Sequence, residues 1–453
     1  MERRHFLKNT LAGATMLSFT SGSFSEIFGQ KAPSNKIKVA LIGCRNQGWS
    51  NLENFLKYPD VECISLCDVD DEWLNKCAAA VEQRTGKKPP QLVKDWRRVI
   101  DNQDVDAVII GTPDHWHCLP LVAACQAGKD AYVEKPLANT IEECNLMVKA
   151  VRKYNRIVQV GQWQRSDPHW DEAAAFVQSG RLGQVRTVKV WAYQTAKWTL
   201  PVVPDSNPPT GVDYDMWLGP APKRNFNSNR FHYNFRFFWD YAGGLMSDWG
   251  VHLLDYALKA MNVGLPAYVY GAGSKYAYPN DAMETPDTLM VTYKYPGFNI
   301  IWDHACGIGH GDFDKGEGLA FFGENGTLIL TRGGWEVRPE NNNRGRNFPY
   351  CYPCDDAPSP ATPRMEAVEW KKGEGKGLYK HVGNLLECIK SRQQPNCSIE
   401  TGAQTAKLSH LANISCRLGK ALAWNDSTNT FDDKRANKLV KAYYRAPWKL
   451  PVV

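Results

Sequence analysis

Short apolar runs rich in β-branched residues alternate with stretches of helical spacing through the first third of the chain. The apolar runs are Ile37–Gly43, Val61–Cys67, Ala107–Gly111, Asp130–Glu134 and Ile157–Gly161. The helical stretches are Asp71–Thr85, Leu119–Ala127 and Ile141–Tyr154. Apolar strands of this length that alternate with helices indicate a parallel sheet buried on both faces. With right-handed crossovers the fold is doubly wound, and its ligand site lies at the carboxyl ends of the strands.

The turn after the first strand carries a nucleotide-binding pattern. Gly43 and Gly48 occupy the first and third glycine positions of G-x-G-x-x-G, and Arg45 replaces the middle one. In such a turn the first glycine permits a tight bend, the middle one a close approach of the pyrophosphate, and the third close packing of helix and strand. The predicted cofactor residues of this turn are Gly43, Arg45, Asn46, Gln47 and Gly48.

Asp68 closes the second strand, 68 − 43 = 25 residues after the first glycine. An acidic residue there accepts both ribose hydroxyls of NAD and repels the extra phosphate of NADP. The alternative is a helix N-cap, for which Asp70 is better placed. We therefore expect NAD, while a phosphate contact from Arg45 keeps NADP open as the less favoured cofactor.

The first thirty residues have the layout of an export signal. Arg3 and Arg4 precede Phe6-Leu7-Lys8, and a mildly apolar stretch follows from Thr10 to Phe19. This order is typical of a bacterial twin-arginine signal peptide, with a frayed basic terminus as the alternative. We expect residues 1–30 to direct the protein to the periplasm. No cysteine closely follows the apolar core, so we expect no lipid anchor.

Composition narrows the function classes. The 453 residues carry a net charge of +6, from 54 basic and 48 acidic side chains, with no basic block beyond the extreme N-terminus. A nucleic-acid partner is therefore not expected. No run of 18 apolar residues predicts an ordinary membrane span. Of the 16 Trp, seven lie between Trp163 and Trp249, which favours sugar stacking, with core packing as the alternative.

The 13 cysteines are scattered, and only Cys351 and Cys354 form a close pair. Such a pair is a metal half-site, a redox pair or a loop disulfide, and spacing alone does not choose among them. Because no second pair lies nearby, we predict no metal site.

Three further motifs resemble the Gfo/Idh/MocA oxidoreductase family when combined with the nucleotide half. Glu134-Lys135-Pro136 ends the fourth strand, Thr112-Pro113 with His117 follows the third, and Gly243-Gly244-Leu245-Met246-Ser247-Asp248-Trp249-Gly250-Val251-His252 comes later. The resemblance implies an α/β protein with an N-terminal Rossmann domain, placed at 35–161. It also implies a C-terminal α/β domain at 162–453, with a large, mostly antiparallel open sheet that often mediates oligomerisation. A homo-oligomer is therefore expected.

Three residues are the predicted catalytic groups. Lys135 at a strand end can bind a substrate hydroxyl and act as acid or base, whereas a solvated loop lysine is the alternative. Asp248 and His252, 252 − 248 = 4 residues apart, share one face of a predicted helix. His252 is a natural proton acceptor that Asp248 can orient. A core pair and half a metal site are the alternatives.

Two further groups of residues complete the predicted site. Those on the cofactor side are Thr112, Pro113, His117, Glu134, Lys135 and Gln164. Those on the substrate side, where rings stack on sugars and cations bind hydroxyls or an acid group, are Trp163, Arg165, Lys197, Trp198, Arg236 and Trp239. Sheet packing is the alternative for each member of the second group.

The compartment restricts the reaction, because the periplasm supplies no free NAD. We therefore expect an oxidoreductase that acts on a sugar or cyclitol hydroxyl with tightly retained NAD. The close alternative is a redox-neutral, NAD-dependent glycoside hydrolase that oxidises C3 and eliminates the aglycone. A second alternative is a non-catalytic carbohydrate-binding protein, which only the replacement of the middle glycine by Arg45 favours.

Overall fold

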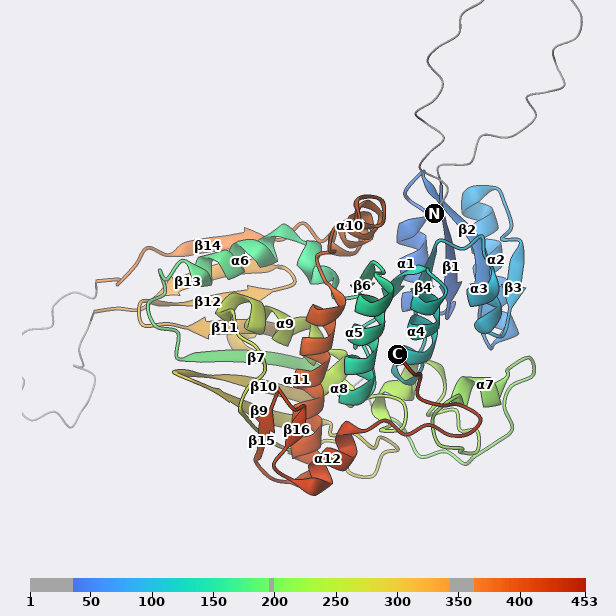
Figure 1. The fold of residues 1–453 in the computed structure, drawn as a ribbon. Coiled ribbons are helices and arrows are strands. Elements are labelled where there is room, and N and C mark those ends of the chain that lie inside the picture. The colour runs from blue at the N-terminus through green and yellow to red at the C-terminus, as the bar shows by residue number, and fades with distance from the viewer. Residues whose placement is uncertain (1–35, 195–198, 343–361) are drawn as a thin grey trace, which may run out of the picture. The chain divides into compact units, whose positions relative to one another are not determined.

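Six parallel strands form the first sheet, in the order β3-β2-β1-β4-β5-β6 (Figure 1). The computed structural model describes residues 36–194, 199–342 and 362–453. The strands are β1 (Ile37–Ile42), β2 (Val61–Cys67), β3 (Gln91–Val93), β4 (Ala107–Ile110), β5 (Asp130–Val133) and β6 (Val158–Val160). This order confirms the predicted doubly wound sheet, with β1 and β4 at its centre.

Helices cover both faces of this sheet. They are α1 (Gln47–Phe55), α2 (Asp71–Thr85), α3 (Arg97–Asp101), α4 (Cys118–Gln126) and α5 (Ile141–Tyr154), with the short η1 (Asp114–Trp116) before α4. The Asp70 side chain caps α2 by accepting from the Glu72 N–H at 2.9 Å. Neither β3 nor α3 is predicted from the sequence. The strand β3 is a three-residue edge strand whose side chains are all half-buried and show no apolar pattern, and α3 is only five residues long.

Ten strands form the second sheet, in the order β14-β13-β12-β11-β7-β10-β9-β8-β15-β16. They are β7 (Thr187–Gln194), β8 (Tyr268–Ser274), β9 (Thr288–Tyr295), β10 (Phe298–Cys306), β11 (Glu317–Phe322), β12 (Gly326–Thr331), β13 (Gly334–Pro339), β14 (Val368–Lys372), β15 (Leu422–Asn425) and β16 (Thr430–Phe431). Among the described strands of this sheet only β7 and β10 pair in parallel. The expected large, mostly antiparallel sheet is confirmed.

The remaining helices pack against the second sheet or connect it to the first. They are α6 (Pro168–Gln178), α7 (Tyr214–Leu218), α8 (Gly244–Asp248), α9 (Gly250–Met261), α10 (Gly377–Ser391), α11 (Ile399–Leu418) and α12 (Lys434–Val440), with the short η2 (Trp163–Ser166), η4 (His232–Phe237) and η5 (Asp312–Asp314). Residues Ile37–Val453 form one compact unit. No helix of the described ranges has both the length and the apolar character needed to span a bilayer.

Helix α11 lies between the two sheets and touches both. A Cβ added at Gly402 would stand 2.5 Å from the Val160 side chain at the end of β6. A Cβ added at Gly271 of β8 would stand 3.0 Å from the Ala412 carbonyl oxygen of α11. Glycine at these two positions therefore lets one helix approach both sheets closely.

Residues 199–242, called the strap below, cross to the carboxyl edge of the first sheet. The Asp213 N–H donates to the Val69 carbonyl at 2.9 Å, and Lys94 Nζ donates to the Gly211 carbonyl at 2.7 Å. His232 Nε2 donates to Asp70 Oδ2 at 2.9 Å. These bonds tie the strap to the edge at which a doubly wound sheet binds its ligand.

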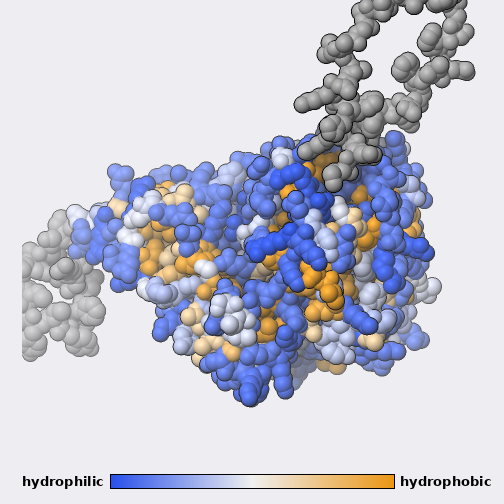
Figure 2. All heavy atoms as spheres, viewed as in Figure 1, coloured by the Kyte–Doolittle hydropathy of each residue, from blue (hydrophilic) through white to orange (hydrophobic). Residues whose placement is uncertain are grey.

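The last residues of the chain return to α4 and α5. Tyr444 Oη donates to Glu143 Oε1 at 2.8 Å, and the Trp448 ring meets Trp116 edge-on with centroids 4.9 Å apart. Figure 2 shows that this face of the molecule is largely hydrophilic, with smaller apolar areas around α4 and α5 and beside α9.

Candidate active site

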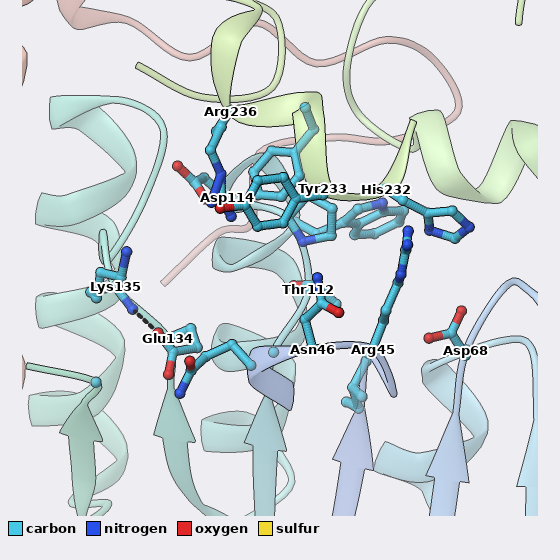
Figure 3. A pocket seen from close by; sticks show the side chains of 18 of the residues that line it. Arg45, Asn46, Asp68, Thr112, Asp114, Glu134, Lys135, His232, Tyr233 and Arg236 are labelled. Carbon is cyan, nitrogen blue, oxygen red and sulfur yellow. Dashed lines mark hydrogen bonds between the residues drawn. The ribbon is translucent and has the colours of Figure 1, made fainter. Parts of the chain in front are cut away.

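A pocket of about 450 Å³ lies at the carboxyl edge of the first sheet, between that edge, the strap and α8–α9. Figure 3 shows its two ends, with Arg45 and Asp68 at one and Lys135 at the other, and with His232, Tyr233 and Arg236 above them. The pocket therefore joins the predicted nucleotide turn to the predicted catalytic lysine.

The glycine turn is shaped by close backbone contacts. Gly43 has φ +92°, and a Cβ there would lie 2.7 Å from the Gly111 carbonyl oxygen. A Cβ on Gly48 would lie 1.9 Å from the Gly43 carbonyl oxygen. No side chain caps the N-terminus of α1 at Asn46, and no acidic residue lies in its first turn. The first N–H groups of this helix are therefore suited to a pyrophosphate.

Asp68 is held at the end of β2 by two backbone donors. Its Oδ2 accepts from the Cys44 N–H at 2.7 Å and its Oδ1 from the Asp70 N–H at 3.0 Å. Burial raises the pKa of Asp68 to about 6. Each oxygen retains a lone pair on the pocket side for ribose hydroxyls.

Other pocket groups also fit a dinucleotide. The buried Thr112 Oγ1 has no hydrogen-bond partner among the described residues. The Arg45 guanidinium lies over the Trp73 ring, 4.7 Å from its centroid, which turns this side chain toward α2. The first N–H groups of α1, the Asp68 carboxylate and the Thr112 hydroxyl are donors and acceptors that suit the phosphates and the ribose of NAD.

Lys135 follows β5 and reaches across the pocket to Asp248. Its Nζ donates to Asp248 Oδ1 at 2.6 Å and to the Asp248 carbonyl at 3.0 Å. Arg236 approaches the other carboxylate oxygen at 3.4 Å. Although burial opposes it, the charges of Arg236 and Lys135 hold the pKa of Asp248 well below its usual range. The Lys135–Pro136 peptide is cis.

His252 has one ring nitrogen, Nε2, without a hydrogen-bond partner among the described residues, and the ring lines the pocket. Its Nδ1 lies 2.9 Å from Gln164 Oε1, and because that oxygen only accepts, Nδ1 carries the proton. Burial, followed by the charges of Lys135 and Arg332, lowers the pKa of His252 well below its usual value. The ring is thus neutral at neutral pH, and Nε2 has a lone pair that can accept a proton.

Asp248 and His252 both line the pocket, but they do not share one regular helix. Asp248 is the last residue of α8, Trp249 separates the helices, and His252 lies in the first turn of α9. The expectation of a single helix is corrected here. Trp249 serves as the C-cap of α8 and the N-cap of α9, and its φ of −95° keeps the chain close enough to helical for both side chains to face one side.

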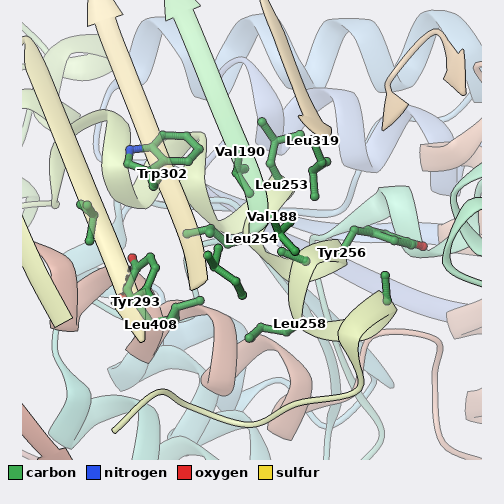
Figure 4. Packing of buried hydrophobic residues seen from close by; sticks show 14 of the residues in the cluster. Val188, Val190, Leu253, Leu254, Tyr256, Leu258, Tyr293, Trp302, Leu319 and Leu408 are labelled. Carbon is green, nitrogen blue, oxygen red and sulfur yellow. Dashed lines mark hydrogen bonds between the residues drawn. The ribbon is translucent and has the colours of Figure 1, made fainter. Parts of the chain in front are cut away.

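Hydrophobic packing fixes α9 and therefore His252. Leu253, Leu254, Tyr256 and Leu258 of α9 pack in one buried cluster with side chains of β7, β9 and β10 (Figure 4). The second sheet thus serves as the support that presents His252 to the pocket.

The remaining predicted residues fall in different places. Glu134, Pro113, Trp163 and Arg236 line the pocket. His117 is buried, with its ring nitrogens 2.8 Å from the Pro136 carbonyl and 2.9 Å from the Thr112 carbonyl, so it holds two pocket loops together. Gln164 is not in the pocket lining, but its Oε1 contacts His252 Nδ1 and so positions the ring.

Two predicted substrate residues lie away from the pocket lining. Arg165 makes a two-pronged ion pair with Asp255, at 2.6 and 2.7 Å, in which the Asp255 carboxylate is buried. Trp239 donates from its indole nitrogen to the Glu284 carbonyl at 3.0 Å. Lys197, Trp198, Cys351, Cys354 and the segment 1–30 lie outside the described residues.

Asp114 and Arg332 are charged or titratable pocket residues that were not predicted from the sequence. Asp114 follows Thr112-Pro113 at the end of β4, and burial raises its pKa to about 8 in the neighbourhood of Lys135, Asp248 and Arg236. Arg332 lies in the turn between β12 and β13. Asp114 could have been found from its place in the predicted loop, but no local pattern marks Arg332. Among the described residues, no group of three or more His, Cys, Asp or Glu side chains is arranged to hold a metal.

Comparison with protein families finds matches over most of the chain. Residues 37–162 match the model of an oxidoreductase family with an NAD-binding Rossmann fold. Residues 172–304 and 376–450 match the C-terminal α/β domain of the same family.

Curated relatives are similar over part of the chain only. An α-N-acetylgalactosaminidase from Shewanella oneidensis is 29% identical over 162 residues, which are 32% of this chain and 35% of the relative. A glycosyl hydrolase family 109 protein from Akkermansia muciniphila is 32% identical over 119 residues, 25% of each chain. The chain thus spans about a third or less of the length of these relatives.

Solved structures share the fold over nearly the whole described chain. The aldose–aldose oxidoreductase from Caulobacter crescentus has a TM-score of 0.61 and 19% identity, covering 86% of this chain and 99% of its own. A levoglucosan dehydrogenase in complex with NADH has a TM-score of 0.61 and 19% identity, covering 85% and 98%. The myo-inositol 2-dehydrogenase from Lactobacillus plantarum has a TM-score of 0.60 and 17% identity, covering 86% and 99%.

Proposed function

The chain belongs to the Gfo/Idh/MocA family of oxidoreductases, and we propose that it oxidises a hydroxyl group of a sugar or cyclitol with NAD as cofactor. One observation carries the proposal: a single pocket joins the glycine turn and Asp68 to Lys135, Asp248 and His252. The fold shared with levoglucosan and inositol dehydrogenases supports a substrate of this class.

When bound, NAD supplies the acceptor for the hydride that leaves the substrate carbon. Lys135 donates a hydrogen bond to the substrate oxygen, and its charge stabilises the negative charge that develops there. His252 Nε2 accepts the hydroxyl proton, so loss of one hydride and one proton leaves a carbonyl. Asp248 holds the Lys135 ammonium in place through its 2.6 Å contact, and Gln164 keeps the His252 proton on Nδ1.

The strap supports tight retention of the cofactor. Asp213 donates to Val69, His232 to Asp70, and Lys94 to the Gly211 carbonyl of the strap, all at the edge of the first sheet beside Asp68. A cofactor lying in the pocket leaves only when these bonds yield. A retained NAD is returned to its starting state by a second substrate, which the proposed periplasmic location requires.

A redox-neutral glycosidase is the second candidate, because the curated relatives include an α-N-acetylgalactosaminidase. In this reaction, oxidation at C3 acidifies the C2 proton, and loss of that proton expels the aglycone. Water then adds to the unsaturated sugar, and the hydride returns to C3. Lys135 and His252 would serve the oxidation and reduction steps as above.

Turnover of Lys135→Ala tests the oxidoreductase. The NAD-loaded protein is mixed with aldoses and with inositol while nicotinamide absorbance is followed. Loss of the ammonium should lower kcat by at least about 100-fold. Lys259→Ala is the matched control, because Lys259 also pairs with an aspartate, Asp171, at 2.6 Å, but lies outside the pocket lining. Unchanged turnover in Lys135→Ala would refute the proposed role.

Aryl α-N-acetylgalactosaminides separate the two candidates. The glycosidase predicts aglycone release without net NADH and incorporation of solvent deuterium at C2. The oxidoreductase predicts NADH formation from a free sugar and no aglycone release.

A further inference from the structure

Arg332 brings a third cation to the pocket wall near His252. It occupies the turn between β12 and β13, and its backbone N–H donates to Glu317 Oε1 at 3.0 Å. Its guanidinium carbon lies 4.5 Å from the centroid of the Trp249 ring and 5.3 Å from that of Trp163. The two rings fix the direction of a long side chain that would otherwise be free to move.

The Arg332 guanidinium lacks an acceptor within the described part of the chain. Its Nε is buried without a hydrogen-bond partner, and no carboxylate oxygen of those residues lies within 4.0 Å of it. Glu317 opposes the charge of Arg332, but its Oε1 accepts from the Arg332 backbone N–H, its Oε2 has no hydrogen-bond partner among the described residues, and burial raises its pKa. Arg332 is half-buried, and its unpartnered Nε is shielded from solvent. A cation in such a place is costly without an acceptor, which indicates that a ligand supplies one.

The charge of this end of the pocket leads to the same conclusion. Lys135, Arg236 and Arg332 are cationic, whereas Asp248 is the carboxylate that both Lys135 and Arg236 contact. Asp114 and Glu134 are the other carboxyls at this end of the pocket. Burial raises the pKa of both, that of Asp114 to about 8, so that Asp114 is mostly neutral at pH 7. Even with Glu134 ionised, the three cations outnumber the carboxylates. The wall thus carries more positive than negative charge where the substrate binds.

We propose that Arg332 is the subsite for a carboxylate on the sugar substrate, so that the pocket selects a uronic acid or its glycoside over the neutral sugar. The planar fork of a guanidinium matches a carboxylate with two parallel hydrogen bonds. Trp163 and Trp249 present their rings to the sugar beside that group. This inference rests on the proposed function, because it names the substrate class of the same pocket.

Paired ligands test the subsite by binding alone. The NAD-loaded protein is titrated calorimetrically with methyl glucuronide, methyl galacturonide and methyl mannuronide, each against the corresponding neutral methyl glycoside. We expect the acidic member of at least one pair to bind at least tenfold more tightly, which is about 1.4 kcal/mol. Equal binding in every pair, or tighter binding of the neutral members, overturns the proposal on the wild-type protein alone.

The variant Arg332→Gln should reduce that preference to less than twofold. Arg338→Gln is the matched control, because Arg338 lies on the adjoining strand β13, pairs with Glu336 and is absent from the pocket lining. A preference that persists in a folded Arg332→Gln protein overturns the assignment to this residue. Tighter binding of the 6-sulfate of the neutral glycoside than of the uronide overturns the assignment to a carboxylate.

Binding tests the carboxylate subsite and turnover tests the proposed function, so the two proposals can be refuted independently. Uronide preference that depends on Arg332, without hydride transfer or aglycone release, supports the subsite and refutes the proposed function. Turnover of neutral sugars, without tighter binding of the uronides, supports the proposed function and refutes the subsite.

Discussion

At the scale of single residues, the pocket keeps its titratable groups in opposite protonation states. Asp248 is ionised because the charges of Arg236 and Lys135 outweigh its burial, whereas Asp114 forms no ion pair with any described residue and its burial prevails. His252 stays neutral for the same reason of burial. An ionised Asp248, a neutral Asp114 and a neutral His252 thus line the same pocket, an arrangement typical of acid–base catalysis.

Asp114 predicts a pH-dependent loss of stability. Its folded-state pKa of about 8 lies above the ordinary value of 3.8. Its stabilising contribution is therefore present below about pH 4 and is lost as pH rises toward 8, by about 1.4 kcal/mol per pH unit. The side chain introduced in the variant Asp114→Asn does not titrate. The free energy of unfolding of the variant minus that of the wild type should therefore increase from pH 5 to 8 and stay constant at higher pH. Urea unfolding across this range measures the difference.

Asp104→Asn serves as the control for that series, because Asp104 is an exposed aspartate paired with Lys38. Its free energy of unfolding, plotted against pH from 5 to 8, should run parallel to that of the wild type. Parallel curves for Asp114→Asn as well would contradict the proposed burial effect.

At the scale of elements, the β1–α1 turn depends on the absence of side chains. Gly48→Ala places a Cβ 1.9 Å from the Gly43 carbonyl oxygen, and both atoms belong to a turn that cannot move far. We expect a loss of about 1–3 kcal/mol in the free energy of unfolding and little NAD in the purified protein. Thermal unfolding and nucleotide released on denaturation measure the two effects.

Gly86→Ala isolates the cost of backbone strain from the effect on the cofactor. Unlike Gly48, Gly86 has a positive φ, of +71°, and a Cβ there meets nothing within 4 Å, so the substitution strains only the backbone. This variant should lose about 1–2 kcal/mol and retain its NAD. Equal NAD content in both variants would argue against a nucleotide at the glycine turn.

At the scale of the whole molecule, the strap is expected to control release of the cofactor. His232→Ala removes the bond to Asp70 that holds the strap to the first sheet. NAD should then dissociate at least about tenfold faster on dilution into a nucleotide trap, because one anchor is worth roughly 1.4 kcal/mol. Arg224→Ala is the control, since Arg224 bonds to Asp240 and Glu284 and not to the first sheet. Equal release rates in both variants would exclude this role.

We also propose that the whole folded protein is exported by the twin-arginine route. Replacement of Arg3 and Arg4 by lysine should leave the protein in the cytoplasm, because the twin-arginine route reads that pair. Cell fractionation followed by immunoblotting measures the outcome. Periplasmic protein at wild-type level in the double variant would refute the proposed route.

Local spacing was enough to predict five of the six strands of the first sheet. Val61–Cys67, Asp71–Thr85 and Ile141–Tyr154 are observed with the predicted bounds, because buried strands and amphipathic helices have periods visible over a few residues. The glycine turn and Asp68 followed from the same local signal. The motif Glu134-Lys135-Pro136 and the stretch from Gly243 to His252 predict Lys135, Asp248 and His252 as catalytic residues.

Long-range packing decided the rest. Arg332 joins His252 only because the turn between β12 and β13 reaches the same pocket, and a turn arginine has no local signature. Arg165 was expected at the substrate but pairs with Asp255, whose buried carboxylate needs a cation. The break between α8 and α9 and the path of the strap depend likewise on contacts between segments far apart in the chain. Periodicity reports burial, whereas the partner that each buried polar group finds is set only when the chain is folded.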